Sequence, residues 1–307
     1  MEPIDRTAPN NATERGFSRI DLTVVVAVLA IGFALLLPAL RQSSNYSGTM
    51  VGGSNMKRLT AAWYLYAIDN GEKLPPTRDG GQSGLVSNKL SWVAGWFTYD
   101  NQNTHNTNTS YLTQPYGLRG GFPTGETNRQ TGGTILHYGG LLGAYESDPL
   151  LFRNPNDPSY MVAINGQSLP RVRSVSMNLM LGAIASQGLD GFVNNNVGGG
   201  YRAFPRLSSF AGMSPSSTFV LIEEHPDSLN DGNFVVDLGN PQNMVDWTGN
   251  FSNGGFWISF ADGRVDLWRF RGESFHKPML RTFGATISLS QEEQSLFRRV
   301  QSATSSR

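Results

Sequence analysis

The side chains best suited to bind a metal ion lie in the segment EEHPDSLNDG, at 223–232. Its candidate oxygen ligands for Ca²⁺ are Glu223, Glu224, Asp227, Asn230 and Asp231. Their spacing matches no EF-hand loop. Asp and Asn side chains can also cap backbone amides in a polar turn around Pro226 and Gly232. The segment therefore predicts either a calcium site or a hydrogen-bonded turn.

The same carboxylates are the visible candidates for acid–base catalysis, and their placement does not favour it. Because Glu223 and Glu224 are adjacent, they would point to opposite faces of a strand, which does not suit a glycosidase pair. The histidines, His105, His137, His225 and His276, do not have metal-ligand spacing. The sequence has no cysteine, phosphate-binding loop, nucleophile elbow or dinucleotide motif. We therefore expect a protein that is not an enzyme and has no certain cofactor.

The composition narrows the class of protein further. Lysine plus arginine number 24 and aspartate plus glutamate number 24, so no net charge attracts nucleic acid, which we exclude as a partner. Charged residues make up 16% of the chain, and Gly, Asn, Ser and Thr are plentiful. This composition favours a turn-rich, β-dominated body, which we place at residues 72–285.

The strongest local signal for strands is GGFWISFADGRVDLWRF, at 254–270. Asp262-Gly263 separates two alternating runs, as a two-residue hairpin turn does, and this pairs Ala261 with Arg264. That register places Trp257 opposite Trp268 on one face of the hairpin. The tryptophan pair predicts either ordinary packing or a platform for a sugar ring.

Two segments have helical signals. In NMKRLTAAWYLYAIDNG, residues 55–71, a core stripe recurs at helical spacing and Gly71 ends the helix; the stripe is Met56, Leu59, Trp63 and Tyr66. In ISLSQEEQSLFRRVQS, Ser290 and Glu293 form a capping box before the apolar residues Leu296, Phe297 and Val300. The polar, glycine-bearing stretch 41–54 predicts a break or flexible neck before the first of these helices.

An apolar run near the N-terminus is long enough to enter a membrane. Between Asp21 and Arg41 no residue is charged, and about 19 residues give roughly 28 Å of helix, close to a bilayer core. Three interpretations compete for this segment, residues 22–40: a cleaved secretory signal, an uncleaved anchor, or a segment that uses the carboxylate of Asp21.

The third interpretation rests on a resemblance. Gly16-Phe17, the acid Asp21 five residues into the mature chain, and Pro38 within the apolar run resemble the signal of type IV prepilins and type II secretion pseudopilins. The resemblance implies that prepilin peptidase cuts after Gly16 and methylates Phe17. It also implies that Asp21 neutralises the amine of Phe17 on a neighbouring subunit. That family usually has Glu where this chain has Asp21 and an apolar residue where it has Arg19.

Four more stretches resemble the large pseudopilin-like proteins of planctomycetes and verrucomicrobia. They are NMKRLTAAWYLYAIDNGEKLPP, RSVSMN at 173–178, EEHPDSLNDGNF at 223–234 and the FADG hairpin. Two positions depart from that family, because its Cys-Pro-x-Asp motif starts here with Asn154 and its histidine is replaced by Ser252. Arg264 also follows the turn in place of a histidine. The departures weaken any metal or redox role for these positions.

Together these features predict an α+β fold: a long N-terminal pilin-type helix, membrane-spanning in its first half, followed by a β-rich antiparallel-sheet head with long loops. We expect a leader at 1–16, the helix at 17–71, the head at 72–285, and a C-terminal helix and tail at 286–307. The function implied by the resemblance is that of a single-pass inner-membrane pseudopilin, with its head in the periplasm or at the cell surface. Its partners would be prepilin peptidase, other pseudopilin subunits and the inner-membrane secretion platform. The alternative is a permanently anchored surface protein whose head binds carbohydrate or another envelope component.

Overall fold

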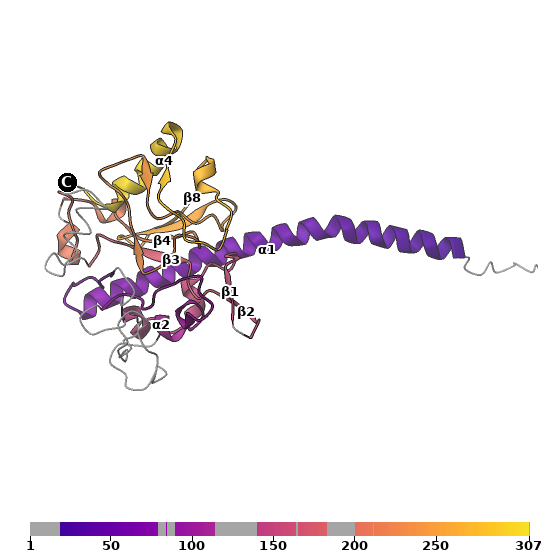
Figure 1. Ribbon diagram of the computed structural model, residues 1–307, viewed down its shortest axis with the longest axis horizontal. Coiled ribbons are helices and arrows are strands. Elements are labelled where there is room, and N and C mark those ends of the chain that lie inside the picture. The colour runs from indigo at the N-terminus through magenta and orange to yellow at the C-terminus, as the bar shows by residue number, and fades with distance from the viewer. Residues whose placement is uncertain are drawn as a thin grey trace, which may run out of the picture. The chain divides into compact units, whose positions relative to one another are not determined.

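The computed structural model describes residues 19–78, 84, 90–113, 140–163, 165–182, 200–210 and 212–306, without the side chains of residues 20, 21, 35–42 and 44. The predicted processing site, Gly16-Phe17, and the side chains of Asp21 and Pro38 lie outside the described part. The chain divides into two units, Met1–Ser44 and Asn45–Arg307. Helix α1, Arg19–Asp69, begins in the first unit and ends in the second (Figure 1).

The helical part of the predicted fold class is wrong. In the described part of the chain, no helix carries a stretch both long and apolar enough to cross a bilayer, so a membrane-spanning pilin-type helix is not supported. The same finding overturns the predicted single-pass location in the inner membrane.

The predicted neck at 41–54 is also wrong, because α1 continues through it as one helix of 51 residues. Gly52 and Gly53, which have no side chains, let other residues of the second unit pack closely against the helix backbone. A Cβ at Gly52 would lie 2.6 Å from Nδ2 of Asn154, and one at Gly53 would lie 2.7 Å from the ring of Trp257. Tertiary packing against this glycine face therefore outweighs the low helix propensity of glycine.

The second unit contains a five-stranded sheet in the order β5-β3-β4-β7-β8. Its strands are β3 (Val175–Asn178), β4 (Phe219–Glu223), β5 (Asn233–Phe234), β7 (Phe256–Phe260) and β8 (Val265–Trp268). The β3–β5 pair is parallel, and the other pairs are antiparallel. The unit is β-rich, and its two cores lie on opposite faces of this sheet, one containing α1 and the other α4, Gln291–Thr304.

Shorter elements complete the unit. Two small ribbons pair β1 (Tyr160–Val162) with β2 (Ser168–Pro170), and β6 (Asn243–Met244) with β9 (Ile287–Ser288). Helix α2 is Ser110–Thr113. The 3₁₀ turns are η1 (Thr104–Asn106), η2 (Leu141–Ala144), η3 (Pro149–Phe152), η5 (Leu207–Phe210), η6 (Pro215–Ser217) and η7 (Glu273–Phe275).

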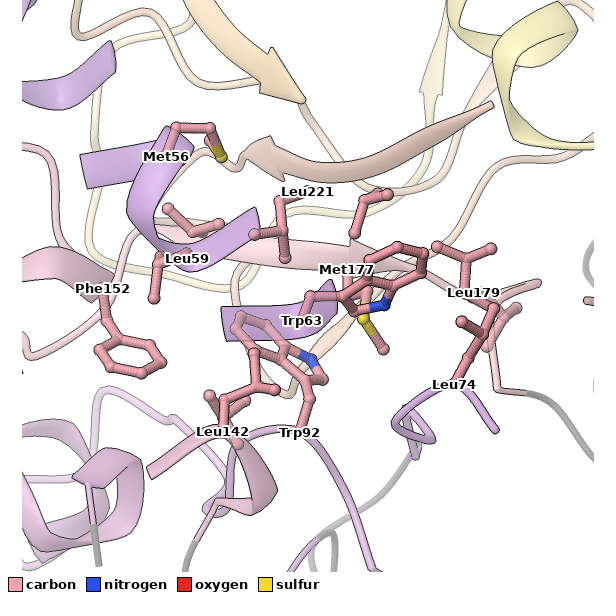
Figure 2. Close-up of a cluster of buried hydrophobic side chains, with 14 of the residues drawn as sticks. Met56, Leu59, Trp63, Leu74, Trp92, Leu142, Phe152, Met177, Leu179 and Leu221 are labelled. Carbon is pink, nitrogen blue, oxygen red and sulfur yellow. The ribbon is translucent and has the colours of Figure 1, made fainter. Parts of the chain in front are cut away.

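The predicted apolar stripe of α1 is confirmed as core. Met56, Leu59 and Trp63 are buried and belong to the same cluster as Met177 of β3 and Leu221 of β4, as Figure 2 shows. Tyr66 is partly buried at the edge of this cluster. The helix ends at Asp69, and Gly71 has a left-handed φ of +62°, as the predicted stop requires.

The predicted C-terminal helix is confirmed as α4. The side chain of Ser290 accepts from the backbone N–H of Glu293, and the Glu293 carboxylate accepts from the backbone N–H of Ser290. Phe297 and Val300 are buried against the second face of the sheet, with Leu296 packed at its edge. The local capping signal and the apolar spacing therefore located this element correctly.

The hairpin exists, but its predicted register is wrong by one residue. Ser259 pairs with Val265, and Phe256 pairs with Trp268. The backbone N–H of Phe260 donates to the carbonyl of Arg264 at 2.9 Å, which leaves a three-residue loop. Trp257 therefore packs with the α1 core and Trp268 with the α4 core, on opposite faces. The predicted tryptophan sugar platform does not form.

Replacing Gly263 with alanine should destabilise the protein by about 1 kcal/mol, because Gly263 has a φ of +86° in the hairpin loop. No atom lies within 4 Å of an added Cβ, so the effect comes from the backbone alone. Gly263→Asn is the control, because asparagine tolerates this conformation and should lose less stability. Chemical denaturation measures both. Equal losses for the two variants would contradict the left-handed conformation.

Candidate functional site

The predicted metal-binding segment starts at the buried end of β4 and is almost completely enclosed. Glu223, Glu224, Asp227 and Asp231 are each 2% exposed or less. Hydrophobic strands on both sides, β3 and β7, hold β4 in the middle of the sheet, and the chain turns back after Glu224 to form β5. The cluster is therefore a buried polar layer rather than a surface cleft.

Glu223 lies between the sheet and the loop that contacts α1. Its carboxylate accepts from Nδ2 of Asn154 at 2.5 Å and from the backbone N–H of Trp257 at 3.0 Å. Burial raises the pKa of Glu223 to about 8, although the two donors oppose this shift. The carboxyl group is therefore held mainly in its neutral form at neutral pH.

Asn154 and Ser252, two of the positions that depart from the resembled family, come together near Glu223. Nδ2 of Asn154 donates to Oγ of Ser252 at 3.2 Å, and the backbone N–H of Asn154 donates to Oγ of Ser174 at 2.7 Å. Two residues further on, Asn156 donates from Nδ2 to the carbonyl of Asn45 on α1 at 3.0 Å. This cluster therefore connects the sheet to the helix.

Glu224 points away from this cluster and is surrounded by hydroxyl groups. Its carboxylate accepts from Oγ of Ser176 and, at 2.8 Å, from Oγ of Ser228. Burial raises the pKa of Glu224 to about 8, and the positive charge of Arg173 opposes the shift. As predicted from their adjacency, the two glutamates have separate surroundings.

Sequence reasoning missed Arg171 and Arg173, which fill the inside of the 223–232 turn. Arg171 donates to the carbonyls of Pro226 at 2.6 Å and Leu229 at 2.7 Å. Arg173 donates to the carbonyls of Asp231 and, at 2.6 Å, of Val175. Both side chains are fully buried, which lowers their pKa values, that of Arg173 to about 10. The two guanidinium groups thus satisfy the backbone carbonyls of the turn that point toward its inside.

Aromatic rings cover the two guanidinium groups. Arg171 lies 4.9 Å from the ring centroid of Phe97 and 5.1 Å from that of Tyr99. Arg173 lies 4.9 Å from the centroid of Phe97 and 5.9 Å from that of Trp92. The available signal was the alternating basic sequence RVR at 171–173, which ends two residues before β3 begins.

Asp227 and His225 anchor the loop that follows the hairpin. The Asp227 carboxylate accepts from the hydroxyl of Tyr99 at 2.7 Å and from the backbone N–H of Leu280 at 2.6 Å. Nδ1 of His225 accepts from the backbone N–H of Asp227, so Nε2 carries the proton and donates to the carbonyl of Lys277 at 3.0 Å. Burial lowers the pKa of His225, which favours this neutral form.

The other two predicted calcium ligands form the end of the turn. Oδ1 of Asn230 accepts from the backbone N–H of Asp231, and Oδ1 of Asp231 accepts from that of Asn233, both at 2.7 Å. The five side chains are thus divided among separate protein donors. Within the described ranges, no group of three or more His, Cys, Asp or Glu residues is placed to hold a metal ion. The contacts match the hydrogen-bonded turn, the second of the two interpretations.

With this geometry in view, comparisons give no further guide to function. No protein-family model, curated protein or solved structure matches this chain. The buried layer offers hydrogen bonds and charge pairing but no exposed nucleophile or base. Its hydrogen bonds join three parts of the second unit: the sheet, the 154–157 loop and the segment of α1 that starts at residue 45.

Proposed function

We propose that the chain is a structural subunit of a pseudopilin-like filament, of the type II secretion or type IV pilus kind, and not an enzyme. The observation that carries this proposal is the exposed apolar surface on the first part of α1. Its large side chains are between 43% and 68% exposed: Leu22, Val24, Val25, Val26, Val28, Leu29, Ile31 and Phe33. At 100° per residue they cover every side of the helix. A helix that is apolar on all sides is stable in water only when these side chains are buried against another apolar surface. The same helix of other copies can provide that surface.

The C-terminal part of the same helix is firmly fixed within the second unit. Nε1 of Trp257 on β7 donates to the carbonyl of Thr49 at 2.8 Å, and the hydroxyl of Tyr64 donates to the carbonyl of Ala261 at 2.5 Å. The Asn156 contact and the α1 core add to these. In this proposal, the first part of α1 contacts other subunits, and its C-terminal part is built into the second unit. The helix can therefore transmit force from the filament to that unit.

Processing after Gly16 is the direct test of this function. The proposed partners are prepilin peptidase and other subunits of the same kind. A peptidase of this type needs a residue without a side chain before the cut, so Gly16→Glu should remain at full-length mass. Unaltered protein should begin with N-methylated Phe17. Mass spectrometry of the N-terminal peptide from the native host distinguishes the two.

The charge-matched control is Asn11→Glu, which adds a carboxylate to the leader without touching the cut and should be processed normally. A Gly16→Glu protein found at mature mass would contradict the proposed processing. An unaltered protein that retains Met1 would do the same.

A further inference from the structure

A shallow groove of about 400 Å³ lies between α4 and the β7–β8 hairpin. Its lining includes Phe260, Arg264, Trp268, Arg298, Arg299 and the serine Ser216. The groove lies on the α4 face of the sheet, away from α1 and from the buried layer around Glu223. It has an aromatic floor and a strongly basic rim, and it plays no part in the function proposed above.

Aromatic rings hold two of the guanidinium groups in place. Arg264 lies 3.8 Å from the ring centroid of Phe260, and Arg299 lies 4.3 Å from that of Trp268. Stacking fixes the planar fork of an arginine, so less side-chain entropy is lost when it binds a carboxylate. The rim is therefore organised for oxyanions before any ligand arrives.

The positive charge of the rim is only partly neutralised. Arg264 is paired with Asp266. Arg298 and Arg299 are exposed, and no acidic side chain of the described residues lies within ion-pair distance of either. Charge complementarity therefore favours an anionic occupant.

The groove runs beside an open strand edge. β8 is the last strand of the five-stranded sheet, and β7 is its neighbour. Within the part of the chain that the structure describes, the outer edge of β8 makes no backbone hydrogen bond. Such an edge presents free N–H and C=O groups at regular spacing, which can pair with another extended chain.

We propose that this edge and groove bind an extended acidic segment of a partner protein, which adds to β8 as a further strand. Arg264 and Trp268 are four residues apart and line the same groove, so alternate side chains of this edge face it. A strand paired with β8 places its own alternate side chains on that face. Acidic residues at every second position then reach Arg298 and Arg299 while the backbone is paired.

The experiment measures binding of a fluorescent peptide of alternating valine and glutamate to the full chain by anisotropy. We expect saturable binding, about tenfold weaker for the Arg298→Glu, Arg299→Glu variant. The control variant is Arg271→Glu, which reverses the charge of an exposed arginine outside the groove. It should bind the peptide within about twofold of the unaltered protein. The single variant Arg298→Glu serves if the double variant does not fold, as checked by circular dichroism.

Two further probes separate edge pairing from simple charge attraction. The same acidic peptide, N-methylated at every residue, keeps its charge but has no backbone N–H to donate from either edge, and it should bind at least about tenfold more weakly. Hydrogen exchange at residues 265–268 should slow when the unmethylated peptide binds. Equal binding of the methylated peptide, unchanged exchange, or no binding of the acidic peptide would overturn the proposal. Binding of polygalacturonate in place of the peptide would overturn it in favour of an anionic polysaccharide.

Discussion

At about pH 9 the Glu224→Gln variant is expected to be more stable than the unaltered protein, whereas Glu223→Gln is expected to gain less at that pH and to be less stable than the unaltered protein at about pH 5. Both carboxyl groups have pKa values raised from 4.5 to about 8 by burial. The folded protein therefore holds protons on them that the unfolded chain releases.

The direction of the pH effect follows from these raised values. The stabilising contribution of the two neutral carboxyl groups is fully present below about pH 4.5 and is lost as the pH rises through about 8. One pKa unit corresponds to roughly 1.4 kcal/mol, so the loss over this window amounts to several kcal/mol. Besides burial, the charges of Arg173 and Asp231 act on the pKa of Glu224, and the charge of Asp157 acts on that of Glu223.

The two glutamines differ because of what surrounds them. The hydroxyl groups of Ser176 and Ser228 can reverse, and Oγ of Ser228 already lies 3.3 Å from the carbonyl of His225, to which it can donate. They can therefore accept from a glutamine amide at 224. Glu223 faces two fixed N–H donors, from Asn154 and Trp257, and a glutamine amide would leave one of them unsatisfied. An unsatisfied buried group of this kind costs about 1 to 3 kcal/mol.

Denaturant titrations at about pH 5, 7 and 9 measure the free energy of unfolding for each variant. Glu224→Gln should reduce the fall in stability with pH by about half, because one of the two groups remains. Glu273→Gln changes an exposed glutamate and should leave the profile unchanged. The same steep fall in Glu224→Gln as in the unaltered protein would show that this carboxyl is not the titrating group.

Local signals in the sequence predicted several elements correctly. The capping box at Ser290 and the α1 stripe from Met56 to Trp63 each lie within one element, so their spacing alone specifies it. The hairpin was located for the same reason. Its register was not, because an Asp-Gly pair occurs in both two- and three-residue loops, and the difference moves Trp268 to the other face.

The buried layer could be predicted only in part, because its contacts join distant segments. The acidic residues were found, but Asn154, which donates to Glu223, lies 69 positions away from it, and Ser252, which Asn154 also contacts, lies 98 positions from Asn154. The arginines at 171 and 173 were missed because their acceptors in the 223–232 turn lie 55 and 58 positions away in the sequence. Likewise, Gly52 and Gly53 weaken a helix in isolation and were read as a break, although they admit Asn154 and Trp257.

Removal of the Asp21 carboxylate is expected to impair assembly strongly and to leave the fold of the second unit intact. In the proposed filament, the amine of Phe17 would be enclosed among α1 helices and paired with Asp21 of a neighbouring copy. Two opposite charges attract strongly in such a low-dielectric bundle, whereas an unpartnered buried charge costs about 3 to 5 kcal/mol. Asp21→Ala should therefore lower association by two or more orders of magnitude, at roughly 1.4 kcal/mol per factor of ten.

Disulfide cross-linking reports this association. The chain has no cysteine, so Leu29→Cys, at a position 57% exposed on α1, introduces a single thiol. Asp21→Glu keeps the charge and restores the residue usual in the resembled family, so it should cross-link as well as the unaltered acid or better. Thr23→Ala removes a neighbouring exposed hydroxyl that donates to the carbonyl of Arg19, and it should leave the yield unchanged. Equal yields from Asp21 and Asp21→Ala proteins would mean that the acid has no role in assembly, and apolar contact between helices would then have to drive association alone.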